Sequence, residues 1–279
     1  MKRHLNTLFV TTQDTWLSKE GECVELRLAG KTLGKIPLHT LQSIACFGRI
    51  SCSQYLLEHC ARLGVLVTWF TEYGRFMAAM HGPTTGNVLL RRAQYRLADS
   101  SEASSELARF FIVGKIANCR TVLLRQARKT GEPALETTAE KLGMILRRLA
   151  APHGLETLRG LEGDAAHLYF GVFHLLVKNE FRDAMHFAGR SRKPPRDEVN
   201  CLLSFFYSLL ANDIRSALEG VGLDPAVGFL HRERPGRPSL ALDVMEEFRP
   251  YLADRLALTL VNRQQIAASD FIRTEVGGF

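Results

Sequence analysis

Glu162 is a carboxylate within residues 161–177, a mostly apolar stretch that predicts a buried helix. A carboxylate beside Ala165, Ala166 and Tyr169 costs free energy unless a cation or a hydrogen-bond donor compensates it. A carboxylate placed at such a position despite this cost indicates that Glu162 has a functional role. The alternative is structural, because Glu162 would lie near the N-terminus of the predicted helix, where the helix dipole favours an acid and solvent reaches it.

A histidine and three carboxylates follow within residues 228–250, GFLHRERPGRPSLALDVMEEFRP. His231 lies in a predicted loop, and the predicted helix after it carries Asp243, Glu246 and Glu247. A spacing of three and four residues puts these carboxylates on one face of a helix. One histidine with two carboxylates suits Mg²⁺ or Mn²⁺ better than structural Zn²⁺, which prefers thiolates and imidazoles. The alternative is a solvated acidic face that pairs with the neighbouring arginines.

Basic side chains surround these candidates, and their charge suits a phosphate backbone. Residues 182–196 interrupt the helical pattern with a glycine and two prolines, and taken alone this loop is also typical of an exposed linker. We expect the DNA-binding side chains to be Arg182, Arg190, Arg192, Lys193, Arg196, Arg232, Arg234 and Arg237. Together with the histidine and the carboxylates, they predict metal-dependent phosphodiester chemistry on a nucleic acid.

The elements that must position these residues fall into two parts. Residues 1–85 show short strand patterns separated by Gly, Asp and Ser, with one helix predicted over 51–63 and a strand hairpin over 65–80. Glycine, proline and threonine cluster in residues 81–87 and predict a boundary. Helices are predicted beyond it over residues 91–97, 102–129, 133–150, 161–177, 199–220 and 239–248. The predicted fold class is α+β multidomain, with an N-terminal β-rich domain (1–85) followed by a larger all-α catalytic domain (86–279).

The composition is that of a globular protein, with 279 residues of which 46% are hydrophobic and 23% are charged. It excludes a disordered or collagen-like chain, and no apolar run reaches the roughly 20 residues of a membrane span. The net charge of +7 concentrates in residues 91–160, where 13 basic and 7 acidic side chains favour a polyanionic partner. Six scattered cysteines without a CxxC motif, in a chain whose start does not read as a leader, indicate reduced, buried thiols and a cytoplasmic protein.

Ordered blocks along most of the chain resemble the CRISPR-associated integrase of spacer acquisition, a metal-dependent DNA endonuclease, in the shape found in type I systems. The blocks are WLSKEGE, the VLVTWF–EYGRF hairpin, LEGDAAHLYF, PPRDEVNCLLSFFYSLL, GFLHRERPGRPSLALDVMEEFRP and DFIRTEVGG. Agreement across several blocks in the same order is a specific signal. The resemblance implies a β-rich dimerisation domain and a helical catalytic domain, with further basic sequence expected after Phe279.

The resemblance also implies site residues and partners. It carries the catalytic and metal-binding positions over to Glu162, His231, Asp243 and Glu246, with Mg²⁺ or Mn²⁺ as the ion and Glu247 as an alternative to Glu246. Members of the family join the 3′-hydroxyl of a short DNA fragment to a CRISPR repeat by transesterification, as homodimers with a small ferredoxin-like adaptation partner. Two other functions stay open, a non-catalytic nucleic-acid scaffold of the same fold and a structural dimerisation protein.

Overall fold

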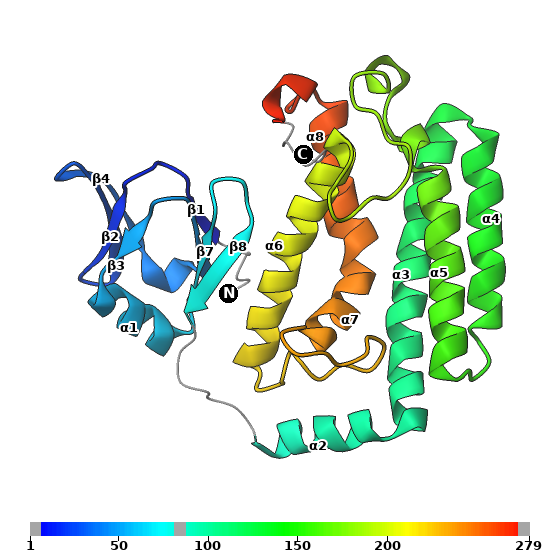
Figure 1. Cartoon of the computed structure of the whole chain (residues 1–279), viewed down its shortest axis with the longest axis horizontal. Coiled ribbons are helices and arrows are strands. Elements are labelled where there is room, and N and C mark those ends of the chain that lie inside the picture. Colours follow the sequence, from blue (N-terminus) through cyan, green and yellow to red (C-terminus); the bar gives the residue numbers. More distant parts are fainter. Residues whose placement is uncertain (1–6, 81–87, 273–279) are drawn as a thin grey trace. The chain divides into compact units, whose positions relative to one another are not determined.

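The computed structural model describes residues 7–80 and 88–272 of the chain (Figure 1). The chain divides into two compact units, Met1–Asn87 with Glu219–Gly222, and Val88–Leu218 with Leu223–Phe279. Strands make up most of the first unit and helices make up the second, which confirms the predicted fold class. The predicted linker and most of the DFIRTEVGG block lie outside the described residues.

One sheet of the first unit has four strands in the order β1 (Thr7–Val10), β5 (Ser43–Phe47), β7 (Leu66–Phe70) and β8 (Phe76–Met80). β5 runs parallel to β1 and β7, and β8 forms an antiparallel hairpin with β7. Every residue of β5 is buried, as expected for a central parallel strand that is covered on both faces.

The second sheet has the order β4 (Lys31–Pro37), β3 (Cys23–Leu28), β2 (Trp16–Glu20) and β6 (Ser51–Cys52). The sequence pattern missed β2, because its WLSKE segment places polar and charged residues without the alternation of a half-buried strand. A tight turn in the KEGE segment joins β2 to β3, with Gly21 at a φ of 57°.

The α-helix described within residues 7–80, α1 (Gln54–Leu63), ends as its sequence predicts but begins at Gln54 rather than at residue 51, because Ser51–Cys52 form strand β6. The Ser53 side chain accepts a hydrogen bond from the backbone N–H of Leu56, and Gly64 ends the helix with a φ of 71°. Apolar side chains of α1 and of both sheets share one buried core, which includes Leu17, Val24, Ile44, Leu56 and Val67.

The described part of the second unit consists of helices and the loops that join them. Its elements are α2 (Val88–Asp99), α3 (Ser101–Thr130), α4 (Pro133–Arg148), α5 (Leu155–Gly171), the 3₁₀ turns η2 (Phe173–Leu176) and η3 (Asn179–Phe181), α6 (Glu198–Gly220), α7 (Ser239–Phe248), the π-helical turn η4 (Arg249–Asp254), α8 (Arg255–Asn262) and η5 (Ala268–Asp270). The 30-residue α3 packs against α4, α5 and α7, and Figure 1 shows α3, α5 and α4 side by side. α3 is therefore the helix against which the site-bearing helices α5 and α7 both pack.

α5 corrects the helix predicted over residues 161–177. It begins at Leu155 and ends at Gly171, and the following 3₁₀ turn is a separate element. The sequence concealed its first two turns, because charged residues and a glycine interrupt the apolar pattern there. Glu162 therefore lies in the middle of the helix, which removes the helix N-terminus as the explanation for its charge.

α7, η4 and α8 form a continuous helical path that passes through Pro250. Pro250 has no backbone N–H and disturbs the regular hydrogen bonding of an α-helix, and the chain passes it in a π-helical turn. This turn matters for the site, because Arg249 and Asp254 both belong to it.

The expectations from composition hold in part. All six cysteines are free, and Cys46, Cys60 and Cys119 are buried, whereas Cys23, Cys52 and Cys201 are partly exposed. Within residues 7–80 and 88–272, none of the helices combines the length and the apolar character needed to cross a membrane.

Candidate metal centre

Lys115 on α3 joins two of the predicted site carboxylates. Its Nζ forms an ion pair with Oε1 of Glu162 on α5 and lies 2.6 Å from Oε2 of Glu246 on α7. The side chains of Lys115 and Glu246 are 6% and 3% exposed, whereas that of Glu162 is 26% exposed. Burial by itself lowers the pKa of Lys115, but Glu246 and Glu162 outweigh burial and hold this pKa above its usual value. The lysine is therefore a buried, charged ammonium that bridges two carboxylates.

Glu246 contacts a second cation. Nη1 of Arg249, one helical turn further along, lies 2.6 Å from Oε1 of Glu246. Burial raises the pKa of Glu246, but the charges of Arg249 and Lys115 more than reverse that effect and lower it to about 2. Glu246 is therefore ionised although it is buried.

Glu247, the neighbour that helical spacing left as an alternative, faces elsewhere. It is exposed, and its side chain covers Gly114 of α3 so closely that a Cβ at this glycine would lie 3.0 Å from its Cγ. Of the two adjacent glutamates, the structure places Glu246 beside Glu162.

Asp243 holds the loop that carries His231. Its Oδ1 accepts the backbone N–H of His231 at 2.9 Å and lies 2.6 Å from the ring Nδ1, and its Oδ2 accepts the backbone N–H groups of Phe229 at 2.6 Å and Leu230 at 2.9 Å. The side chain is fully buried. A carboxylate has about four lone-pair directions, and these four contacts occupy them. Asp243 therefore acts behind His231 and has no direction left for another ligand.

The contact with Asp243 fixes the tautomer of His231. A carboxylate can only accept, so Nδ1 of the neutral ring carries the proton and Nε2 presents a lone pair. Nε2 lies 4.0 Å from Oε1 of Glu246, and the side chain is 21% exposed. Histidines that bind metals are commonly held in this way, with one nitrogen on a carboxylate and the other open to the ion.

Arg159 on α5 braces the same loop. Its Nε and Nη2 donate hydrogen bonds to the backbone carbonyl of Leu230 at 2.9 and 2.6 Å. Glu156 forms ion pairs with Arg159 and with Arg232, the latter at 2.9 Å. The helix that carries Glu162 is thus tied to the loop that carries His231, and the predicted DNA-binding Arg232 is paired with an exposed glutamate.

A second buried acid lies close to the first cluster. Asp254 accepts hydrogen bonds from the hydroxyl of Tyr207 at 2.6 Å and from the hydroxyl of Tyr169 at 3.1 Å. Burial raises the pKa of Asp254 to about 6, against the opposing effects of both hydroxyls and of Arg249 and Arg190.

A small cavity lies between Lys115 and this second acid. It measures about 10 Å³, and its walls include Lys115, Tyr207, Arg249, Asp254 and Arg192. A volume of about 10–15 Å³ is what a single water molecule requires. The cavity therefore has room for one group of that size next to the bridging lysine.

The eight predicted DNA-binding side chains divide by their contacts. Arg182 donates to two backbone carbonyls of the preceding turn, and Arg190 donates to Oδ1 of Asn200 at 2.7 Å and lies over the ring of Tyr207. These two arginines therefore hold the loop 182–196 in place. The side chains that remain exposed are Arg192, Lys193, Arg196, Arg232 and Arg234, and Arg237 is partly buried.

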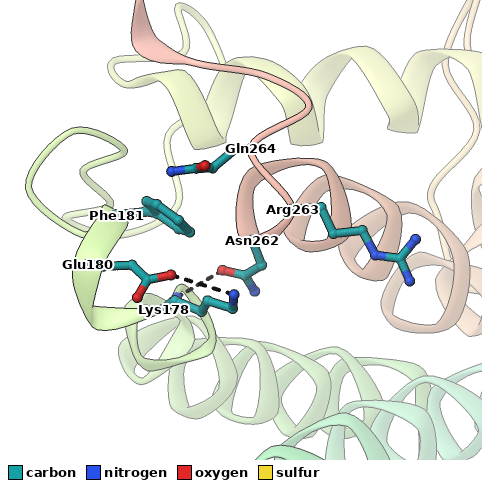
Figure 2. A pocket seen from close by; sticks show the side chains of 6 residues that line it. All are labelled: Lys178, Glu180, Phe181, Asn262, Arg263 and Gln264. Atoms are coloured by element: carbon teal, nitrogen blue, oxygen red, sulfur yellow. Dashed lines mark hydrogen bonds and ion pairs between the residues drawn. The ribbon is translucent and has the colours of Figure 1, made fainter.

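A wider hollow of about 610 Å³ lies between the start of η3 and the end of α8 (Figure 2). Lys178 in its wall is paired with Glu180 at 3.5 Å, and its backbone N–H donates to Oδ1 of Asn262 at 2.8 Å. Figure 2 shows Arg263 pointing away from this pair. Lys178, Glu180 and Asn262 thus contact one another across the hollow, and the candidate site remains the cluster around Lys115.

The donor types of the cluster suit a divalent cation, whereas the ammonium of Lys115 occupies the position between two of the carboxylates. As placed, no three His, Cys, Asp or Glu side chains within the described ranges lie close enough to share an ion, because the ammonium stands between Glu162 and Glu246. The donor set itself, two carboxylates and Nε2 of His231, is one that Mn²⁺ or Mg²⁺ accepts. The two oxygens of Glu246 face different cations, Oε1 facing Arg249 and Oε2 facing Lys115, each at 2.6 Å.

The sequence indicated four residues of the candidate site but not the cations that pair with them. The structure unites Glu162, His231, Asp243 and Glu246, and it adds Lys115 on α3. One signal for Lys115 was present, a single lysine in the apolar run FFIVGKIANC. A lysine rarely becomes fully buried unless it is paired, so this position called for a buried carboxylate.

The chain is similar along its length to proteins of known family. Residues 8–279 match the sequence profile of the family described as CRISPR associated protein Cas1. A protein of Chlorobaculum tepidum named CRISPR-associated endonuclease Cas1 1 is 55% identical over 281 residues, covering 99% of this chain and 82% of that protein.

Solved structures show the same fold. A Cas1 protein from Thermotoga maritima gives a TM-score of 0.83 at 24% identity, over 98% of this chain and 84% of that one. A casposase bound to an integration product gives a TM-score of 0.81 at 24% identity, over 97% of this chain and 77% of the casposase.

Proposed function

The chain belongs to the family of CRISPR-associated Cas1 proteins, and on this premise we propose that it is a metal-dependent DNA endonuclease and integrase that inserts short DNA fragments into a CRISPR array. The 55% identical relative is named an endonuclease, and the similar casposase is bound to an integration product. The observation that carries the proposal is the convergence of three side chains from separate segments: Glu162 and Glu246 both pair with the buried ammonium of Lys115, and Nε2 of His231 lies 4.0 Å from Oε1 of Glu246.

We assign the metal ligands as Glu162, Glu246 and Nε2 of His231, with Mg²⁺ or Mn²⁺ as the ion. Asp243, which the sequence predicted as a ligand, is assigned to positioning His231, because the loop occupies both of its oxygens. When bound, a divalent cation at these ligands polarises a phosphoryl oxygen and stabilises the charge that develops around phosphorus.

The proposed reaction is a transesterification. The oxygen of the fragment's 3′-hydroxyl attacks a phosphorus atom of the repeat and forms a new P–O bond, while the P–O bond to the existing 3′-oxygen breaks. The attacking hydroxyl releases its proton to solvent, and the departing 3′-oxygen takes one up. When water attacks instead of the hydroxyl, the same bond breaks in endonuclease cleavage.

The exposed cations Arg192, Lys193 and Arg196 are assigned to the DNA backbone, whose phosphates accept hydrogen bonds from such side chains without regard to sequence. A homodimer and a small ferredoxin-like partner, both implied by the resemblance, complete the proposed assembly.

Replacement of His231 by alanine tests the function. We expect Mn²⁺-dependent cleavage and strand joining to fall by about a hundredfold or more, because a charge-stabilising group is lost, while duplex DNA binding persists. His167→Ala, an exposed histidine on α5, is the matched control and should retain activity. Reactions in EDTA give the metal-free baseline. Activity that survives both EDTA and His231→Ala contradicts the proposal.

A further inference from the structure

Lys115 has a position that the proposed reaction leaves unexplained. Its ammonium lies between Glu162 and Glu246, the two carboxylates assigned to the metal, and it is buried beneath them. A divalent cation that used both carboxylates would need the space that Nζ fills.

We propose that the ammonium of Lys115 occupies the place of the divalent cation in the metal-free protein. When the metal binds, the ammonium leaves Glu162 and Glu246 and moves into the cavity beside Asp254. The inference rests on the metal site of the proposed function and assigns to it an exchange of one cation for another. No bond is made or broken in this exchange, and the lysine keeps its proton.

The charges of the cluster require such an exchange. Glu162, Glu246 and Asp243 carry three negative charges, and Lys115 and Arg249 carry two positive ones, so these side chains together have a net charge of −1. A divalent ion added to this arrangement would leave one uncompensated positive charge in a site that is largely buried, which is costly. Departure of the ammonium reduces that excess and frees an oxygen of each carboxylate.

The cavity beside Asp254 supplies a destination. Lys115 and Asp254 both line it, and its volume of about 10 Å³ is close to that of one water molecule, which an ammonium group matches in size. The flexible four-carbon stem of lysine allows the head group to turn while the helix stays in place. The Asp254 carboxylate, now held by two tyrosine hydroxyls, would receive the ammonium as a counter-charge.

The route of the incoming ion does not cross the lysine. The side chains of Glu162 and His231 are partly exposed, at 26% and 21% of their surface. Those of Lys115 and Glu246 are buried, with exposed fractions of 6% and 3%. The ion therefore reaches the carboxylates from the solvent side while the ammonium withdraws inward.

Calorimetric titration of the full chain with Mn²⁺, without DNA, tests the exchange. Lys115→Met removes the competing ammonium, so we expect it to bind Mn²⁺ at least about tenfold more tightly than the unaltered protein. Lys129→Met, an exposed lysine on the same helix, is the control and should bind Mn²⁺ as the unaltered protein does. Equal or weaker binding by Lys115→Met overturns the inference.

A double-mutant cycle tests the destination. If Asp254 receives the ammonium, Asp254→Asn weakens Mn²⁺ binding several-fold in the unaltered background and changes nothing in the Lys115→Met background. The same effect of Asp254→Asn in both backgrounds overturns this destination.

A crystal structure of the unaltered protein with Mn²⁺ answers the question even if Lys115→Met does not fold. We expect Mn²⁺ on Glu162 and Glu246, with Nζ beyond ion-pair distance of both carboxylates and within it of Asp254. Mn²⁺ bound there with both lysine ion pairs intact overturns the inference alone. If His231→Ala and Glu246→Gln leave Mn²⁺ affinity unchanged, the proposed function itself fails.

Discussion

Replacement of Asp243 by asparagine separates a positioning role from metal binding. The asparagine side chain keeps one accepting oxygen and presents an NH₂ group where Oδ2 accepts the N–H groups of Phe229 and Leu230. Two hydrogen bonds to a charged acceptor are lost, each worth roughly 1.5–3 kcal/mol, and the donors stay buried. We therefore expect the free energy of unfolding to fall by about 3–6 kcal/mol.

The comparison with His231→Ala makes this prediction specific. That variant leaves the three backbone hydrogen bonds to Asp243 intact and removes only the ring contact, so its loss should be about 1.5–3 kcal/mol. Guanidinium unfolding in EDTA measures both variants. Asp164→Asn, an exposed aspartate on α5, is the control and should stay within about 0.5 kcal/mol.

A metal ligand would behave in the opposite way. Without its ion, a carboxylate that faces other carboxylates repels them, and its neutralisation stabilises the metal-free protein. An Asp243→Asn variant that is as stable as the unaltered protein in EDTA, or more stable, refutes the positioning role and restores Asp243 to the ligand set.

Three further predictions follow from particular contacts. The pKa of Asp254 is raised from 3.8 to about 6, so the folded protein keeps the proton on this carboxyl to a higher pH than the unfolded chain does, and stability is lost as the pH rises through 6. Urea unfolding between pH 4 and 7.5 should show the unaltered protein losing about 3 kcal/mol of unfolding free energy relative to Asp254→Asn, at about 1.4 kcal/mol for each pH unit of the shift. Parallel slopes for the two proteins would contradict this. Arg192→Ala and Arg196→Ala should each weaken DNA binding and reduce the slope of log K against log salt concentration by roughly 1. Fluorescence anisotropy at several salt concentrations measures this slope, and an unchanged slope removes these residues from the interface. Glu246→Gln should abolish Mn²⁺-dependent strand joining while Glu247→Gln retains it, and similar losses in both would contradict the assignment of Glu246.

The sequence predicted the residue types of the candidate site because they follow from local rules. His231 precedes a helix that carries acids at a spacing of three residues, and a divalent cation accepts that combination. The division into a strand-rich and a helical part was equally accessible, since the hydrophobic period changes near residue 87. Local rules do not predict which helices and loops contact one another. α3 begins 61 residues before Glu162 in the chain, and only packing brings Lys115 to it.

The predicted start of α5 was wrong, and this error changed the interpretation of Glu162. With the helix placed at 161–177, Glu162 had an ordinary explanation as an acid at a helix N-terminus. With the helix beginning at Leu155, Glu162 lies mid-helix and faces Lys115, so its charge needs a cation as partner. An error of two turns was sufficient to hide that requirement.

Helical spacing also explains why Asp243 and Glu246 could not be told apart from sequence. Residues three apart lie on the same side of a helix but differ by about 60° around its axis. In α7 that difference directs Asp243 toward the loop of His231 and Glu246 toward Lys115 of α3. Arg249 of η4 pairs with the other oxygen of Glu246. One acid therefore orients the imidazole through Nδ1, and the other is the carboxylate that would bind the proposed ion. The two roles require each other, because Nε2 of His231 can point toward Glu246 only while Asp243 holds Nδ1.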